Sequence, residues 1–193
     1  MLRPGEHWTT EETKASELSD GEPSVFHKYL HCVYTDSIIA PNLEDAKDWN
    51  YADHIELYLL ADRLQDFTTV NLVIDEMIRI SQATGREPCL YEVARVYSRT
   101  TQGNPMRRLM RDYQVHHASV TDATSSILQA SGMTEALFDI CQEFVKLVTS
   151  HEDKVVKEVF YDAPWARSKC HYHRHDDEHP GCEAKESVMA PRV

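Results

Sequence analysis

The sequence predicts a mainly α-helical fold, and two observations support this prediction. First, apolar residues recur at positions i, i+3, i+4 and i+7 in several segments, a spacing that places them on one face of a helix. Second, the 193 residues include only 6 glycines and 8 prolines, which suits helices better than a turn-rich β-protein, and 41% of the residues are hydrophobic. A chain of this length and composition can form one domain with an extension.

The first predicted helix follows a polar segment, residues 1–19, which carries charges, Ser and Thr and is expected to be loosely ordered. A turn ends this segment, and Pro23 stands where it can open a helix. The large apolar residues of that helix fall on one stripe: Phe26, Tyr29, Leu30, Val33 and Tyr34. The next residues, 35–50, are expected to form a loop in which Ile38 and Ile39 are candidates for a short strand.

A helical hairpin is predicted next. Two sets of apolar residues with helical spacing flank the short link 65–67: Leu57, Leu60, Ala61 and Leu64 before it, and Val70, Val73, Ile74 and Met77 after it. A link this short requires the two helices to pack almost antiparallel. The stretch 84–88 contains Gly85 and Pro88 and is expected to break the helical pattern.

Residues 86–160 are predicted to form further helices. Asn104 has the side chain of a helix cap, and Pro105 suits the first helical position. Three apolar stripes in this region are expected to be core: Leu90, Val93, Ala94 and Tyr97; Met106, Leu109, Met110 and Tyr113; and Leu137, Ile140, Cys141, Phe144, Val145 and Val148.

A further helix is expected over 119–130, with Gly132 as its C-terminal cap. Three arginines precede it and are expected to make local ion pairs on a solvated helix face, with a binding site for an acidic partner as the alternative: Arg107, Arg108 and Arg111.

Several of these segments resemble the BTB/POZ family, in particular the large group found in filamentous fungi. Residues 57–65, LYLLADRLQ, resemble the motif LY-x-LAD-[KR]-L that opens the closing helical hairpin of that fold. Residues 23–35 resemble its third helix, which ends in a Tyr-Thr pair. Beyond the core domain, VYSRT at 96–100 and MRRLMRD at 106–112 resemble the extension of the fungal group. The resemblance implies that residues 20–83 are the C-terminal half of a BTB/POZ-like domain, followed by a helical extension.

The family domain begins with strands and a helical hairpin, and the polar residues ahead of Phe26 resemble neither. We therefore expect a BTB/POZ (α+β) fold reduced to its C-terminal helices, in which the helix of Phe26 lacks its main packing partners and exposes an apolar patch. The resemblance implies binding of other proteins, through self-association or through a cullin-type scaffold, with Tyr34 to Asp36 as the apolar-x-acidic candidate. The expected partner-binding residues are Phe26, Tyr29, Leu30, Val33, Tyr34 and Asp36.

The charge of the chain excludes two classes of partner. The 32 acidic and 20 basic residues give a formal charge of −12, whereas nucleic acids and anionic membranes both require a basic surface. The apolar runs are too short to span a bilayer, and the polar N-terminus lacks the apolar segment of a signal peptide. Because the five cysteines are also odd in number, we expect an intracellular protein of the cytoplasm or nucleus, not a secreted one.

No catalytic motif occurs in the sequence. It lacks a P-loop, the pattern G-x-G-x-x-G, the pattern G-x-S-x-G and the pattern H-E-x-x-H. Buried structural thiols, and not nucleophiles, are expected at Cys32, Cys89 and Cys141. We therefore do not expect an enzyme.

Residues 161–193 differ in composition from the rest, because Pro, Arg, His, Asp and Glu dominate and the helical pattern ends. We expect a flexible Cys/His-rich tail. Thiolate and imidazole are preferred zinc ligands, and four of them can close a tetrahedral site: Cys170, His173, His175 and Cys182. Their spacing matches no standard zinc finger, so a solvated tail and a structural zinc both stay open, and no other cofactor is expected.

The sequence thus predicts a non-catalytic protein-interaction module that serves as an adaptor or scaffold, including a ubiquitin-ligase adaptor. The alternative is a zinc-binding regulatory protein whose Cys/His-rich tail folds with the metal.

Overall fold

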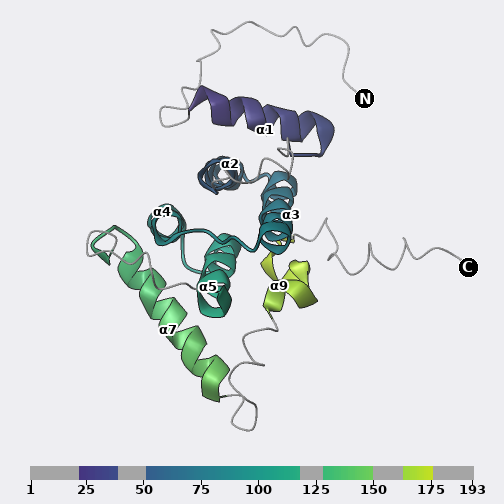
Figure 1. The fold of residues 1–193 in the computed structure, drawn as a ribbon. Coiled ribbons are helices and arrows are strands. Elements are labelled where there is room, and N and C mark those ends of the chain that lie inside the picture. The colour runs from purple at the N-terminus through teal and green to yellow at the C-terminus, as the bar shows by residue number, and fades with distance from the viewer. Residues whose placement is uncertain (1–21, 39–50, 118–127, 150–162, 176–193) are drawn as a thin grey trace, which may run out of the picture.

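The computed structural model describes four stretches of the chain (Figure 1): residues 22–38, 51–117, 128–149 and 163–175. These residues form helices and contain no β-strand, which confirms the mainly α prediction. Ile38 is described and is not in a strand, whereas Ile39 and most of the predicted helix over 119–130 lie outside the described residues. Among the described helices, none is both long and apolar enough to cross a membrane.

Helix α1, Pro23–Thr35, has the boundaries that its residues favour. Pro23 occupies the first turn, where its missing N–H leaves no hydrogen bond unmade. The helix ends because Asp36 adopts a left-handed backbone with a φ of 48°, and its N–H donates to the carbonyl oxygen of Cys32. Only Val25 and Cys32 of α1 are buried, so this helix contacts the body along a narrow strip.

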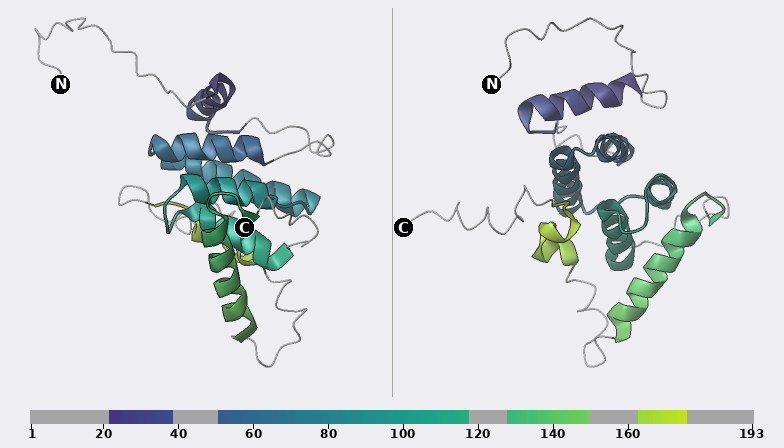
Figure 2. Two further views of the ribbon diagram at one scale, coloured as in Figure 1. Left: turned by 90° about the vertical axis from the view of Figure 1, so that its left-hand side faces the viewer. Right: turned by 180° about the vertical axis from the view of Figure 1, so that it is seen from behind.

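Helices α2 (Ala52–Arg63) and α3 (Phe67–Thr84) form the predicted hairpin, and α1 crosses α2 at one edge of the molecule (Figures 1 and 2). The turn depends on Asp66, whose carboxylate accepts hydrogen bonds from the backbone N–H of Thr69 at 3.1 Å and from its hydroxyl at 2.7 Å. Helix α3 ends at Gly85, which takes a left-handed φ of 64° inside the predicted break.

Helices α4 (Leu90–Arg99) and α5 (Pro105–His117) follow, and Asn104 caps α5 as predicted. Its side-chain oxygen accepts hydrogen bonds from the backbone N–H of Met106 at 2.9 Å and from the hydroxyl of Tyr58 at 2.7 Å. Because Tyr58 belongs to α2, this buried cap also fixes the start of α5 against the hairpin.

Helix α7 (Met133–Thr149) runs along an edge of the molecule and packs on α4 and α5 (Figure 1). It begins four residues before the predicted stripe, because Met133 and Ala136 are the residues that enter the core. The prediction that the whole stripe is core is wrong. Its apolar arc is wider than the surface that α4 and α5 cover, and these members are exposed: Cys141, Phe144, Val145 and Val148.

The thiols also differ in part from the prediction. Cys32 is buried as expected, whereas Cys89 and Cys141 are exposed. Cys89 stands at the N-cap of α4, where its backbone N–H donates to the carboxylate of Glu92 at 2.6 Å. This capping position is exposed, so a Cys residue alone did not imply burial.

Part of the segment predicted to be a flexible tail packs into the core instead. It contains α9 (Pro164–Arg167) and the 3-10 helix η3 (Lys169–Tyr172), and η3 lies against α3 and α5 (Figure 1). Trp165 packs on Tyr113 with 4.7 Å between ring centres, and Tyr172 is fully buried. The prediction of a flexible tail was wrong for these residues. It rested on the polar composition of the segment, but two buried aromatic residues anchor it to the core.

All of these helices share one hydrophobic core. Its largest fully buried side chains come from α2, α3, α5, α7 and η3: Ile55, Tyr58, Ile74, Met77, Ile78, Ile80, Met106, Leu109, Met110, Tyr113, Met133 and Tyr172. The predicted stripes of α4 and α5 are therefore confirmed as core. Leu64, predicted to complete the stripe of α2, is 42% exposed because it lies just beyond the end of that helix.

Gly132 immediately precedes α7 and lies against the backbone of α4. It has a left-handed φ of 83°, and a Cβ added there would lie 2.6 Å from the backbone nitrogen of Ser98 and 2.9 Å from the carbonyl oxygen of Ala94. These backbone atoms cannot move aside without breaking α4. We expect Gly132→Ala to lower the free energy of unfolding by roughly 3–5 kcal/mol, measured by urea denaturation with circular dichroism.

The matched control is Gly85→Ala. Gly85 has a similar φ of 64°, but nothing lies within 4 Å of an added Cβ. Only the backbone strain of about 1–2 kcal/mol applies there. Equal losses in the two variants would contradict the close approach of α7 to α4.

Candidate functional site

The residues expected to bind a partner lie on α1 and form what is here named the α1 face. Phe26, Val33 and Tyr34 are 38%, 47% and 83% exposed. Tyr29 and Leu30 are partly buried beside them. Asp36 is exposed and follows the last turn of the helix. The structure thus leaves several large apolar side chains of one helix in contact with solvent.

A hollow of about 330 Å³ lies between α1, α2 and α4. Glu56 on its wall accepts two hydrogen bonds of 2.7 Å from Arg99 and one of 3.3 Å from Arg95. Lys28 pairs with Asp53, another lining residue, at 2.5 Å. The described residues that line the hollow include no Ser, Thr, Cys or His. Three carboxylates line the hollow, and those of Asp53 and Glu56 are paired with basic side chains.

Two of the four predicted zinc ligands come together. The sulfur of Cys170 lies 3.1 Å from Nε2 of His175, and the ring centres of His173 and His175 are 6.0 Å apart. Nε2 of His173, however, lies 3.3 Å from a carboxylate oxygen of Asp75, and Cys182 lies outside the described residues. Across the ranges that the structure describes, no group of three or more His, Cys, Asp or Glu is placed to hold a metal.

Asp75 on α3 holds the Cys/His segment in place. Burial disfavours its charged form, but the hydrogen bond and charge of His173, together with the charge of Lys169, outweigh burial and lower the pKa of Asp75. Asn71, one turn earlier, accepts a hydrogen bond from the backbone N–H of Arg174 and donates one to its carbonyl oxygen, both at 2.9 Å. The segment is therefore fixed to α3 by backbone and side-chain contacts.

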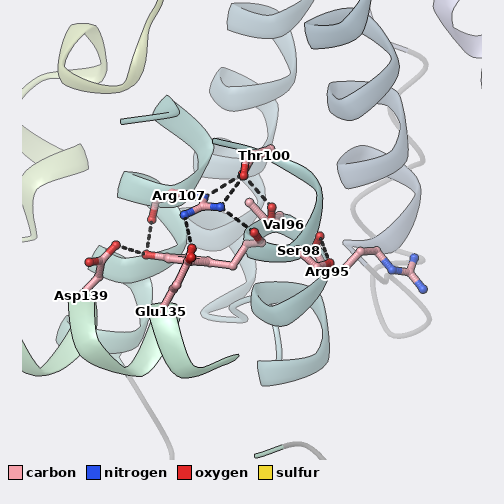
Figure 3. Close-up of polar contacts among 8 residues, drawn as sticks. Arg95, Val96, Ser98, Thr100, Arg107, Glu135 and Asp139 are labelled. Carbon is pink, nitrogen blue, oxygen red and sulfur yellow. Dashed lines mark hydrogen bonds and ion pairs between the residues drawn. The ribbon is translucent and has the colours of Figure 1, made fainter. Parts of the chain in front are cut away.

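Arg107 on α5 makes several polar contacts with α4 and α7 (Figure 3). It is only 8% exposed, and its guanidinium donates to the carbonyl oxygens of Tyr97, at 2.6 Å, and Thr100. It also donates to the Thr100 hydroxyl at 3.0 Å and to the carboxylate of Glu135 on α7 at 2.7 Å. The same group lies 4.6 Å from the ring centre of Tyr97. Arg107 therefore joins α4, α5 and α7.

The hydroxyl of Tyr97 adds a second link between this network and α7. It donates to the carboxylate of Asp139 at 3.1 Å (Figure 3). Burial, and then the negative charge of Asp139, raise the pKa of Tyr97 above its ordinary value. A tyrosine is protonated at neutral pH in any case, and the raised pKa keeps this phenol a donor at higher pH as well.

Local ion pairs on a solvated face were predicted for the three arginines of α5, and only Arg111 makes a local one; Arg107 pairs with the distant Glu135, and the solvated face is wrong. Arg111 is partly buried and pairs with Asp112 at 2.7 Å and with Glu143 at 3.6 Å. Arg108 donates to the carbonyl oxygen of His171 at 3.0 Å. The reason is that α5 is covered by α7 and by η3, so its arginines lie between elements.

One surface was missed at the sequence level, namely the outer side of α7. Phe138 is 62% exposed there and stands next to the exposed residues Cys141 and Val145. The signal was present in the sequence, because the apolar residues of α7 cover about half of its circumference. A helix that packs on a core through only one of its sides requires a narrower apolar stripe than this.

The comparisons with known proteins give no relative: no protein-family model, no curated protein and no solved structure matches the chain. Function must therefore be inferred from the residues and contacts described above.

The Arg107 network makes a prediction about stability. In Arg107→Met, the carbonyl oxygens of Tyr97 and Thr100 lose their donors in a buried site. We expect the free energy of unfolding to fall by about 2–4 kcal/mol, measured by urea denaturation with circular dichroism.

Arg95→Met is the matched control, because it makes the same chemical change at an ion pair on the surface. It is expected to stay within about 1 kcal/mol of the unmodified chain. A loss in Arg107→Met no larger than that of the control would show that the network contributes little.

Proposed function

We propose that the chain is a non-catalytic protein-interaction module of the BTB/POZ type, an intracellular adaptor or scaffold that binds its partner through the α1 face. The observation that carries this proposal is the exposure of Phe26, Val33 and Tyr34 on one helix. Contiguous apolar side chains are unfavourable in water, and a partner that covers them gains the free energy of their burial.

The helix is also held well enough to present these side chains. The buried residues Val25 and Cys32 and the ion pair between Lys28 and Asp53 anchor α1 to the body. Helix α1 is therefore ordered before a partner binds, which reduces the conformational entropy lost on association. A pre-ordered apolar helix fits a partner with an apolar groove.

The residues that carry the resemblance also contact one another. Tyr58 of the LYLLADRL segment donates to Asn104, the cap of α5. Tyr97 and Thr100 of VYSRT accept hydrogen bonds from Arg107 of MRRLMRD. These contacts place α2, α4 and α5, the helices that carry these segments, in one folded unit.

Within this proposal, the partner is a second protein of the same type or a cullin-type scaffold. Tyr34 and Asp36, the ends of the apolar-x-acidic candidate, are both exposed at the C-terminal end of α1. An apolar pocket with a neighbouring cationic or N–H donor group would complement this pair.

Val33→Glu tests the proposal with little effect on folding, because Val33 is exposed. The charge would have to be desolvated in the middle of the α1 face on binding. We expect proteins captured from an extract of the source cells, and a purified cullin N-terminal domain measured by calorimetry, to bind at least about tenfold more weakly.

Leu64→Glu is the matched control, since it places the same charge at an exposed aliphatic residue outside α1. It should retain every interaction that Val33→Glu loses. Identical binding by the two variants would contradict the role of α1. Deletion of the C-terminal segment is a poorer test, because it would remove Trp165 and Tyr172 from the core.

A second candidate function is zinc-dependent regulation, favoured by the 3.1 Å contact between Cys170 and His175. Thiolate and imidazole are the ligand types that zinc prefers. Zinc needs further ligands, and His173 can bind through Nδ1 while its Nε2 keeps the contact with Asp75. Metal binding would then couple the Cys/His segment to α3 through Asp75, which is a means of regulation.

Metal analysis of protein purified without a histidine tag tests this candidate. The zinc hypothesis expects about one zinc ion per chain, most of it lost in Cys170→Ser and retained in the control Cys89→Ser. Cys89 lies at the cap of α4 and is exposed, so it should not take part. Absence of zinc in the unmodified chain, or equal zinc in both variants, would rule out the site.

A further inference from the structure

We infer that the outer side of α7 is a self-association surface on which a second copy of this chain docks, with the two α7 helices antiparallel. The surface is named the α7 face and consists of Phe138, Cys141, Val145 and Val148. It lies at a different edge of the molecule from α1 (Figure 1), so this inference goes beyond the partner site proposed above.

The α7 face is unpartnered within the described residues. Phe138, Val145 and Val148 are 62%, 57% and 44% exposed. Helix α7 lies at the outside of the molecule, and one end of it extends beyond α5 (Figure 2). At a rise of about 1.5 Å per residue, its 17 residues are about 25 Å long, which is enough for a helix–helix contact.

The charge pattern selects a second copy as the occupant. Thr134, Gln142 and Thr149 lie among or beside the members of the α7 face and are uncharged, and Glu135, three residues before Phe138, borders it. The charged residues of α7 lie on one flank of the face and are paired within the chain: Glu135 to Arg107, Asp139 to Tyr97, Glu143 to Arg111, and Lys146 to Glu143. Two chains of formal charge −12 repel one another, so close approach is least unfavourable where a surface carries no charge.

The spacing of the face matches an antiparallel pair. The intervals from Phe138 to Cys141, to Val145 and to Val148 are three, four and three residues, a series that reads the same in both directions. A two-fold axis at its midpoint places Phe138 against Val148 of the second copy and Cys141 against Val145 of the second copy. The interface is then isologous and pairs the largest side chain with a small one.

The size of the face sets the strength of the dimer. Its exposed side chains offer on the order of 400 Å² per copy, about half of what a standard interface buries on each partner. We therefore expect a reversible dimer with a dissociation constant on the order of 10–100 μM, seen only at high concentration.

Sedimentation equilibrium of the full chain over this concentration range tests the inference. The unmodified chain is expected to shift from one copy to two. Val145→Glu places a charge at the centre of the face and should weaken the dimer at least about tenfold. The control Leu64→Glu adds the same charge at an exposed aliphatic residue away from α7 and should dimerise like the unmodified chain.

A charge-pair rescue tests the register. When Val145→Glu is mixed with Cys141→Lys, the antiparallel arrangement sets the introduced Glu against the introduced Lys and leaves the other Cys141–Val145 contact intact. The mixture should therefore dimerise while each variant alone does not. Circular dichroism of each variant checks that its helices are retained.

Any one of three results would overturn the inference. The first is that the unmodified chain stays monomeric at all concentrations, and the second is that Val145→Glu dimerises as well as Leu64→Glu. The third is that the mixture of variants fails to restore the dimer. If the chain is monomeric and Cys141 also reacts with a maleimide far more slowly than Cys89, another part of the same chain covers the α7 face.

Discussion

The buried guanidinium of Arg107 is the interaction on which the arrangement of the helices depends. An arginine is unfavourable in a core unless its N–H groups have acceptors. Here the carbonyl oxygens of Tyr97 and Thr100, which lie at the end of α4 and lack partners within the helix, accept from it. The same side chain bonds to Glu135 and so sets the position of α7. One residue thereby satisfies a helix end, its own donors and the placement of a neighbouring helix.

The hairpin and the C-terminal segment are joined to this body by equally specific contacts. Asn104 links α5 to α2 through Tyr58, and Tyr172 of η3 donates to Asp112 of α5 at 2.7 Å. Burial, together with the negative charge of Asp112, raises the pKa of Tyr172, so its hydroxyl remains a donor. Because these bonds are buried, the helices from α2 to α5 and the C-terminal segment form one body. The α1 face and the α7 face remain at its edges.

Helical periodicity was sufficient to predict the helices and most of the core, because apolar spacing and caps act locally. Asn104 as a cap and Gly85 as a helix end were both readable from residue type. Burial of Trp165 and Tyr172 was not readable, because it depends on surfaces formed by distant helices. The outer side of α7 was misjudged for the same reason, since the pattern shows that Val145 is apolar but not whether another element covers it.

The functional residues were predicted only in part. The residues of the α1 face follow from the apolar stripe and the resemblance. The burial of the α5 arginines was not predicted, because it is caused by α7 and η3. The Cys/His segment illustrates the same limit, because sequence spacing suggested four zinc ligands and the structure pairs Cys170 with His175 but sets His173 against Asp75. Residue type indicates what a side chain can do, and the neighbours supplied by the fold decide which of these roles it takes.

The central claim is that one cooperative body includes the C-terminal segment and leaves α1 at its edge. Hydrogen exchange of the full chain, followed by mass spectrometry, tests this claim most directly. Peptides from α3, α5 and residues 163–175 should exchange slowly and become exposed together at the same denaturant concentration, while α1 exchanges earlier. Exchange of residues 163–175 at the rate of an unstructured peptide, while α5 remains protected, would contradict the claim.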